Sequence, residues 1–509
     1  MSSIQNKKLA KNTAFLYIRM IVVLTVSLFT TRVILQNLGV EDYGIYNVVG
    51  SVVSLFYFLQ TAMSSANYRF MAVAIGKDDM KGLSQCLQNA FIIGLIVAFL
   101  IFILGETIGL YYINNFLNVP HNRFDASVFV FHISIISCIV QCASMVYYSL
   151  IIAREKMNFF AILSIFECCL KITIAILVGI SPIDRLEFYA MLMLGSNFVV
   201  FLVYHLYCRS FLYKIAFSIY QHINRVQFKK MIGFSGWTLF VTLADISVTS
   251  GLNIMINAFF SPVVNAARGV VVQIQGAVDQ FRGNLQTALN PQITKQYAIG
   301  ARERMFNLMS ASGRYSTYIL LLIAIPICIA SEEILAIWLH EVPPYTSIFL
   351  NYVLASCIID GMSNPFVTAI GATGDIKKSQ FLVGLTKLLT VPFAYLALKN
   401  GGSPVTLFQV FTVMTIVTVG VRIFICSRKV HLPLKIILKV MFLPSIMVAI
   451  ISTILSLFLY HIISPATLLQ LIFFVLCTLF ANSLIVWAAG LNSSERTFCM
   501  QFLKAKLIK

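Results

Sequence analysis

Long apolar segments recur along the whole 509-residue chain, and this recurrence limits the possible folds more than any other feature of the sequence. A helix needs about 20 apolar residues to cross a bilayer, and segments of that length recur from residue 12 to residue 489. Charged residues make up only 11% of the chain, so a soluble fold could not cover its own surface. The strands of an outer-membrane barrel would be shorter and would alternate in polarity. We therefore expect an all-α polytopic membrane protein.

Fourteen apolar segments separated by polar breaks predict about fourteen transmembrane helices. They cover residues 12–36, 44–66, 88–112, 125–150, 159–179, 186–207, 232–259, 264–290, 313–338, 346–371, 380–398, 404–425, 436–460 and 467–489. The seventh and eighth segments are the least apolar, so a count of twelve is the main alternative.

Lysine and arginine alternate across the predicted connections, as the positive-inside rule requires of a correct topology. Of the 37 basic residues, 27 fall in connections on the side of the N-terminus and only Arg123, Arg185 and Lys399 fall on the opposite side. This distribution predicts a multi-pass protein with both termini in the cytoplasm. The basic residues lie between apolar segments and form no clustered face, so the net charge of +18 does not indicate nucleic-acid binding.

A weak internal repeat divides the predicted helices into two halves. A shift of 226 residues places the second predicted helix on the eighth, and residues 59–62 match residues 285–288. The shift equals six helices, so the halves would have the same orientation and form a parallel repeat. We predict an N-terminal six-helix lobe (1–207), a cytoplasmic linker (208–231), a C-terminal six-helix lobe (232–427), and two additional helices with a cytoplasmic tail (428–509).

Polar residues line one face of each of the seventh and eighth predicted helices, at steps of three, four or seven residues. On the seventh they are Ser235, Thr238, Thr242, Asp245, Thr249, Asn253 and Asn257, and on the eighth Arg268, Gln275, Asp279, Arg282, Gln286 and Asn290. A charged side chain facing lipid at mid-depth costs about 2.5–3.5 kcal/mol, so these faces must contact water or protein. The faces either line a central water-filled cavity or pack together, with Asp279 and Arg282 neutralising each other one turn apart.

Sequence motifs for enzymatic chemistry are missing from the chain. There is no G-x-x-x-x-G-K-[ST] phosphate loop, no H-E-x-x-H motif and no metal-spaced cluster of histidine and cysteine. We therefore expect no ATP hydrolysis, no cofactor and no enzymatic activity. Other intramembrane charges are ambiguous: Glu167 and Lys171 are spaced to pair on one helix, whereas Asp360 and Lys387 could either pair or line a cavity.

Three stretches of the sequence resemble a known family. They are LGVEDYGIYNVVGSVVSLFYFLQ (38–60), NAARGVVVQIQGAVDQFRGNLQTALNPQITKQYA (265–298) and GATGDIKKSQ (371–380). All three are similar to bacterial polysaccharide and O-antigen flippases of the multidrug/oligosaccharidyl-lipid/polysaccharide exporter (MOP) superfamily, and the second is typical of the lipopolysaccharide branch. The resemblance implies two six-helix lobes around a central cavity, alternating access, a lipid-linked oligosaccharide substrate and a bacterial inner-membrane location.

These observations together predict a flippase for an undecaprenyl-diphosphate-linked oligosaccharide. Arg268, Arg282 and Arg19 would bind the diphosphate, because guanidinium groups match phosphate geometry. Gln275, Gln286 and Asn253 would bond sugar hydroxyls, and Asp245 and Asp279 would couple transport to a proton or cation gradient. The alternatives are a drug/cation antiporter of the same superfamily, which would favour an acidic, aromatic cavity, and a membrane glycosyltransferase, which would need large external loops.

Overall fold

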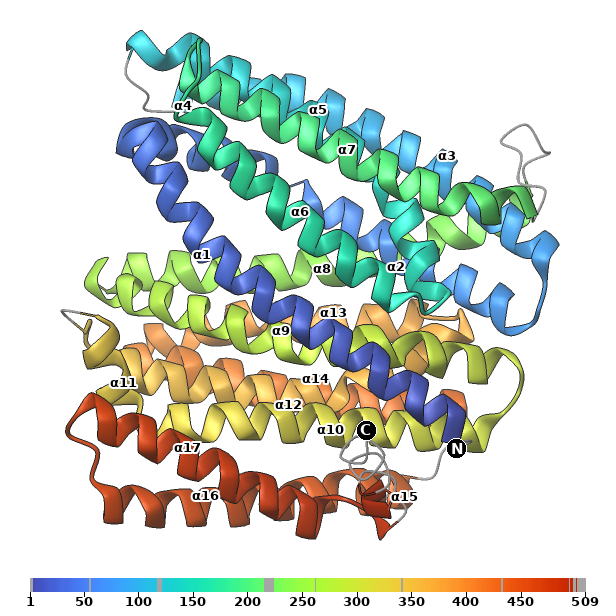
Figure 1. Cartoon of the computed structure of the whole chain (residues 1–509). Helices are drawn as coiled ribbons and strands as arrows, with labels where there is room; N and C mark the ends of the chain where they lie inside the picture. Colours follow the sequence, from blue (N-terminus) through green and yellow to red (C-terminus); the bar gives the residue numbers. More distant parts are fainter. Residues whose placement is uncertain are drawn as a thin grey trace. The chain divides into compact units, whose positions relative to one another are not determined.

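The computed structural model is helical throughout the part of the chain that it describes (Figure 1). The described residues are 3–54, 56–116, 121–214, 224–260, 262–339, 342–431, 434–493, 495–497 and 500. Within them, eleven helices are long and apolar enough to cross a membrane, and residues Asn12–Ser27 form a shorter apolar helix. The protein is therefore an all-α multi-pass membrane protein, as the sequence predicts.

The chain divides into two compact units, residues 10–239 and residues 240–509 grouped with 1–9, and the main division falls within helix α8 (Arg225–Phe259). The first unit contains α1 (Ser3–Ser54), α2 (Tyr57–Gly76), α3 (Met80–Leu104), α4 (Leu110–Phe116), α5 (Phe124–Ala153), α6 (Met157–Val178) and α7 (Arg185–Lys214). Its central helix is α5, which packs against α2, α3 and α7.

The second unit contains the rest of α8, followed by nine further helices. They are α9 (Pro262–Ala298), α10 (Arg302–Ile329), α11 (Ser331–Trp338), α12 (Thr346–Thr373), α13 (Lys377–Lys399), α14 (Pro404–Val430), α15 (Leu434–Ile437), α16 (Leu443–Ile463) and α17 (Leu468–Ile485). Its central helix is α12, which packs against α9, α10 and α14, while α16 and α17 pack on α10.

Each of the fourteen predicted segments lies largely in helix; three of them (88–112, 436–460 and 467–489) run through a short π-helical segment, and two others are divided between successive helices. The predicted helix 44–66 is shared between the end of α1 and the start of α2, and the predicted helix 313–338 breaks at Ala330, between α10 and α11. The second break comes four residues after Pro326, which lies inside α10 and whose carbonyl accepts a hydrogen bond from the amide of Ala330. The two ends of the predicted linker 208–231 belong to α7 and α8. Residues 215–223 of the linker and residues 501–509 of the predicted tail lie outside the described residues.

Helix α1 is kinked at Gly39, whose φ of 82° is accessible to glycine at little cost. Two polar contacts hold the helix before the kink. The side chain of Asn37 donates to the carbonyl of Ala175 in α6 at 2.7 Å, and Arg185 of α7 donates to the carbonyl of Asn37 at 3.0 Å. The kink is therefore fixed by helices α6 and α7 of the same unit.

A second polar cluster lies just beyond the kink, where Arg123 forms ion pairs with both Asp42 and Asp184. Asp184 also caps α7, because its Oδ1 accepts the amide hydrogens of Leu186 and Glu187. Burial alone would raise the pKa of Asp184, but the Arg123 guanidinium and the two amides outweigh it and hold that pKa below its usual value. The cluster therefore joins α1, the start of α5 and the start of α7 through charge.

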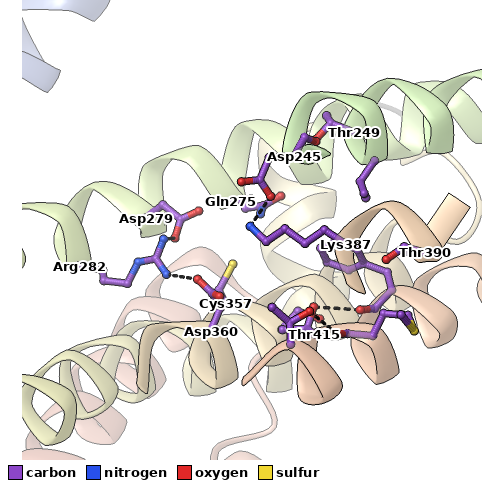
Figure 2. A pocket seen from close by; sticks show the side chains of 15 residues that line it. Asp245, Thr249, Gln275, Asp279, Arg282, Cys357, Asp360, Lys387, Thr390 and Thr415 are labelled. Carbon is purple, nitrogen blue, oxygen red and sulfur yellow. Dashed lines mark hydrogen bonds and ion pairs between the residues drawn. The ribbon is translucent and has the colours of Figure 1, made fainter. Parts of the chain in front are cut away.

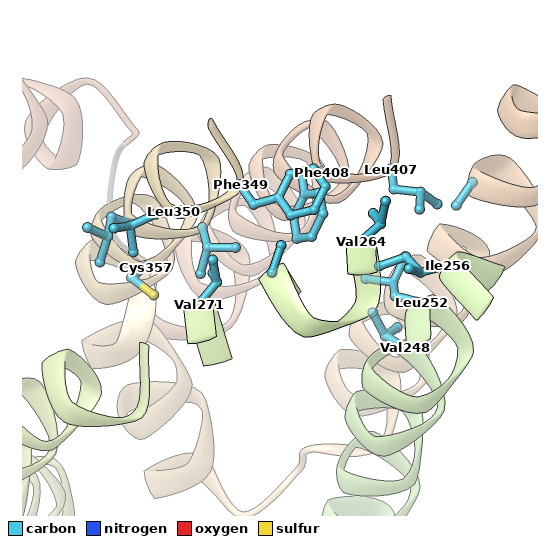
Figure 3. Packing of buried hydrophobic residues seen from close by; sticks show 14 of the residues in the cluster. Val248, Leu252, Ile256, Val264, Val271, Phe349, Leu350, Cys357, Leu407 and Phe408 are labelled. Carbon is cyan, nitrogen blue, oxygen red and sulfur yellow. The ribbon is translucent and has the colours of Figure 1, made fainter. Parts of the chain in front are cut away.

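An apolar core fills one part of the second unit, between α8, α9, α12, α13 and α14 (Figure 3). Leu252 and Val271 contribute from α8 and α9, and the rings of Phe349 and Phe408 stack at 4.1 Å between centroids. The Phe240 side chain of α8 packs closely on α13 at Gly384, where a Cβ atom would lie 2.3 Å from the Phe240 ring. This core and this close approach position the polar side chains described below.

The helical hairpin α16–α17 is fixed to α10 by buried polar contacts. Arg314, with only 3% of its side chain exposed, pairs with Glu495 at 2.5 Å and donates to the carbonyl of Gly490. The hydroxyl of Tyr318 donates to the same carbonyl at 2.9 Å. The hairpin is therefore an integral part of the second unit.

Candidate functional site

The second unit contains a polar cavity of about 320 Å³ enclosed by α8, α9, α12, α13 and α14 (Figure 2). Its lining residues are Asp245, Val248, Thr249, Gln275, Asp279, Arg282, Ser356, Cys357, Asp360, Lys387, Thr390, Phe411, Met414, Thr415 and Thr418. Six of these have a charged or amide side chain, and such side chains are rare within membrane-spanning helices. We therefore take the cavity as the candidate site.

The two polar faces found in the sequence supply one wall of the cavity. Asp245 and Thr249 come from α8, and Gln275, Asp279 and Arg282 come from α9. Each face stays on one side of its helix because its residues are about one turn apart. Four of the predicted site residues thus line one cavity.

The opposite wall contains charged residues that the sequence alone left without a role. Asp360 comes from α12, and Lys387 comes from α13. Behind them lies Arg422 of α14, a single charge in the apolar stretch VTVGVRIFIC that the sequence analysis did not single out. The only sequence signal for Arg422 is that such a charge needs a partner inside a membrane.

Arg282 bridges the two walls. Its Nη2 lies 3.0 Å from Oδ1 of Asp279 on its own helix, and its Nη1 donates to Oδ2 of Asp360 at 2.7 Å. The other oxygen of Asp360, Oδ1, accepts from Arg422 at 2.5 Å, and Arg422 also donates to the hydroxyl of Ser363 at 2.7 Å. The pairing of Asp279 with Arg282 that the spacing allowed is therefore present, but it is one part of a larger network.

A second ion pair crosses the cavity between Asp245 of α8 and Lys387 of α13. Asp245 is 53% exposed, so this pair contacts the open space of the cavity. With it, the network holds three carboxylates (Asp245, Asp279 and Asp360) and three bases (Arg282, Lys387 and Arg422). The ionised network therefore has no net charge.

Hydroxyl groups cover much of the remaining polar surface. Thr249, Thr415 and Thr418 each donate to the carbonyl of the residue four positions earlier, at 2.8–3.0 Å. Their hydrogens are satisfied within the helix, and their oxygens keep lone pairs that can accept hydrogen bonds. The cavity can therefore accept hydrogen bonds from a hydroxyl-rich ligand.

Arg268 lies outside the cavity lining, although it shares a helix with Arg282. It is 5% exposed, donates to the carbonyl of Thr249 at 2.9 Å, and lies 6.0 Å from the centre of the Phe408 ring. Among the described residues no carboxylate is within ion-pair distance, and its Nε has no partner. Arg268 is thus a buried positive charge next to a cavity residue.

The remaining predicted site residues lie elsewhere. Asn253 of α8 and Gln286 of α9 do not line the cavity, and the Gln286 amide nitrogen is buried without a partner among the described residues. Arg19 belongs to the first unit, where its guanidinium lies 4.5 Å from the centre of the Phe160 ring. No group of three or more metal-ligating side chains occurs among the described residues.

No family model and no curated protein sequence matches this chain. Its fold matches solved structures of MATE transporters. An outward-facing multidrug resistance MATE family transporter of the MOP superfamily has a TM-score of 0.71 at 12% identity, over 85% of this chain and 98% of that chain. The Vibrio cholerae MATE transporter VcmN in its bent form has a TM-score of 0.68 at 15% identity, over 87% of this chain and 100% of that chain.

A third structure is a MOP superfamily transporter from Pyrococcus furiosus, described as having a binding pocket of reverse polarity that suggests a different function. It has a TM-score of 0.67 at 13% identity, over 84% of this chain and 96% of that chain. At these identities the comparisons show a shared fold over nearly the full length of each transporter.

Proposed function

We propose that the protein is a flippase that moves an undecaprenyl-diphosphate-linked oligosaccharide across the bacterial inner membrane by alternating access. The translocated oligosaccharide would be used to build a surface polysaccharide such as the O-antigen of lipopolysaccharide. The MATE-like fold supports a transporter of the MOP superfamily, and the three stretches that resemble O-antigen flippases support the substrate class. The distribution of basic residues supports cytoplasmic termini.

The observation that carries this proposal is the charge balance of the cavity. A carrier for cationic drugs needs carboxylates that are free to pair with its substrate, whereas each carboxylate here already has a base as its partner. Arg282 can form two parallel hydrogen bonds with a phosphate group. The threonine oxygens and Gln275 can bond the hydroxyls of a sugar, so the cavity matches both parts of the substrate headgroup.

Asp245 and Asp279 are the proposed coupling residues. Both face the cavity, and each is partnered by a single base. Protonation of either carboxylate would release its base, so a proton gradient could change the charge that the cavity presents to a substrate. Contact of the substrate with Arg268, Gln286, Asn253 or Arg19 would require another state of the transport cycle.

The second candidate function is a drug/cation antiporter. It is favoured by the fold comparison, because a solved structure with the same fold is a multidrug resistance transporter. A cationic substrate would have to displace Lys387 or Arg282 from a carboxylate before it could bind, which makes this function the weaker match to the cavity.

Complementation of a bacterial strain that lacks its own O-antigen flippase tests the proposal, with surface polysaccharide as the readout. We expect the wild-type chain to restore surface polysaccharide and Arg282→Ala to fail, at equal protein levels in the membrane. Arg428→Ala is the matched control, because Arg428 is exposed at the end of α14, far along that helix from the cavity residues, and should behave as wild type. Failure to complement, together with new resistance to cationic drugs, would favour the antiporter.

A further inference from the structure

The carboxylate of Asp360 is shared by two arginines in a way that separates their roles. Oδ2 accepts from Arg282 and Oδ1 accepts from Arg422. Since each oxygen serves a different guanidinium, one arginine can leave without breaking the hydrogen bond of the other.

The two arginines differ in what surrounds them. Arg282 lines the cavity and has 17% of its side chain exposed, whereas Arg422 is 7% exposed, does not line the cavity and is also bonded to buried Ser363. Breaking the pair between Asp360 and Arg422 would strand a nearly buried guanidinium from its counter-ion, and removing one partner of a buried ion pair is strongly destabilising. Asp360 must therefore stay with Arg422, while Arg282 is free to exchange partners.

We propose that Arg282 is a mobile anion-binding group, that Asp360 is its resting counter-ion, and that Arg422 keeps Asp360 neutralised while Arg282 holds a diphosphate. This inference rests on the proposed function and names residues that would make the exchange possible. A carboxylate that already has one arginine holds a second one less firmly than a free carboxylate does. A diphosphate, with its greater negative charge, can then compete for Arg282.

The exchange makes Asp360 and Arg422 positioning residues with opposite effects. Removal of the Asp360 charge takes away the competitor of the anion, so Arg282 should bind diphosphate more tightly. Removal of Arg422 makes Arg282 the only arginine paired with Asp360. Asp360 then holds Arg282 more firmly, so diphosphate binding should weaken. A merely structural ion pair predicts the same direction for both variants, because each breaks the same contact.

The test measures binding of inorganic pyrophosphate to the purified full-length protein by isothermal titration calorimetry. We expect Asp360→Asn to tighten binding and Arg422→Gln to weaken it, each by about tenfold, the factor that corresponds to 1.4 kcal/mol. Asp375→Asn is the matched control: it also removes one carboxylate from an ion pair, with Lys429, but outside the cavity, and should leave the affinity unchanged. Shifts of Asp360→Asn and Arg422→Gln in the same direction, or no shift in either, would overturn the inference.

The double variant Asp360→Asn with Arg422→Gln covers the case in which a single variant does not fold. It removes both charges of the buried pair, so no unpaired charge remains, and Arg282 is still released. Affinity above that of the wild type supports the inference, and affinity at or below it overturns the inference.

Farnesyl diphosphate, used as a second probe, distinguishes a lipid headgroup from free pyrophosphate. If the wild type binds farnesyl diphosphate more tightly than pyrophosphate, and the affinities of Asp360→Asn, wild type and Arg422→Gln fall in the same order for both probes, the result supports a lipid-linked substrate. An inverted order among the variants for either probe would overturn the exchange. Failure of the wild type in the complementation assay, with the binding pattern intact, would reject the flippase proposal but leave the exchange established.

Discussion

Replacement of Gly384 by alanine tests whether the packing of the Phe240 side chain of α8 on α13 holds the cavity in shape. A Cβ atom at this position would lie 2.3 Å from Cε1 and 2.7 Å from Cδ1 of Phe240, where ordinary contact begins at 3.4 Å. The Phe240 ring is stacked on Phe381 at 6.3 Å between centroids, with 15° between the ring planes. Phe381 precedes Gly384 by three residues on α13, so the ring already packs along that helix, and the Phe240 side chain with the part of α8 that carries it must shift away from α13 to admit the methyl group.

The expected loss of stability follows from two opposing effects. Overpacking of this kind costs about 1–3 kcal/mol, and the gain in helix propensity from glycine to alanine returns at most about 1 kcal/mol. With the overpacking cost near the middle of its range, we expect Gly384→Ala to lower the free energy of unfolding by about 1 kcal/mol. Lys387 is one turn further along α13, so the same movement would separate it from Asp245 and reduce transport.

Gly420→Ala is the matched control for this prediction. Gly420 lies within α14, and a Cβ atom there would meet nothing within 4 Å. The control should be as stable as the wild type or slightly more stable, and it should support surface polysaccharide. Thermal unfolding in detergent and the complementation assay provide the two readouts. Equal unfolding temperatures for Gly384→Ala and Gly420→Ala would refute the reasoning about the α8–α13 contact.

Three further predictions concern charges outside the cavity. Because the pKa of Asp184 is held below its usual value, its stabilising effect should be complete above about pH 4 and disappear as the pH falls through the lowered pKa; the difference in unfolding temperature between wild type and Asp184→Asn should shrink over that range. Glu495→Gln should lower the free energy of unfolding by about 3–5 kcal/mol, since it leaves Arg314 unpaired, and Arg314→Gln in the same chain should restore much of the loss in thermal unfolding. In a cysteine-free background, a cysteine at Lys399 should react with an impermeant thiol reagent from outside the cell and one at Lys378 should not; reaction at Lys378 would contradict the assigned orientation.

The helices and one wall of the cavity could be predicted from the sequence because their signals are local. A membrane helix is a long apolar segment, and a polar face repeats once per turn within a single helix. Asp245, Gln275, Asp279 and Arg282 were found in this way. The same rule also selected Arg268, because periodicity identifies a face but contains no information on where along it the cavity ends.

For the opposite wall the sequence left the roles of Asp360 and Lys387 open and did not single out Arg422, because that wall depends on packing between distant parts of the chain. Asp360 lies 78 positions from Arg282 and 62 from Arg422. Asp360 and Arg422 are each a single charge in an apolar segment, so no periodic pattern marks either of them. The break between α10 and α11 was missed for a similar reason: Pro326 lies inside α10 just as Pro365 and Pro392 lie inside α12 and α13, and the sequence does not mark which of these helices breaks a few residues later.

Carboxylates in a transporter cavity are commonly taken as a sign of cationic substrates, and the network around Asp360 argues against that rule here. An anion carrier needs basic groups in its cavity, but an unpaired arginine in a membrane is costly whenever the cavity is empty. Internal carboxylates remove this cost by pairing with the bases between transport events. The quantity that bears on the substrate charge is therefore the balance of acids and bases, not the presence of carboxylates alone. In this cavity the balance is zero and each carboxylate already has a base as its partner, so an anionic substrate could replace a carboxylate at Arg282 without leaving a base unpaired.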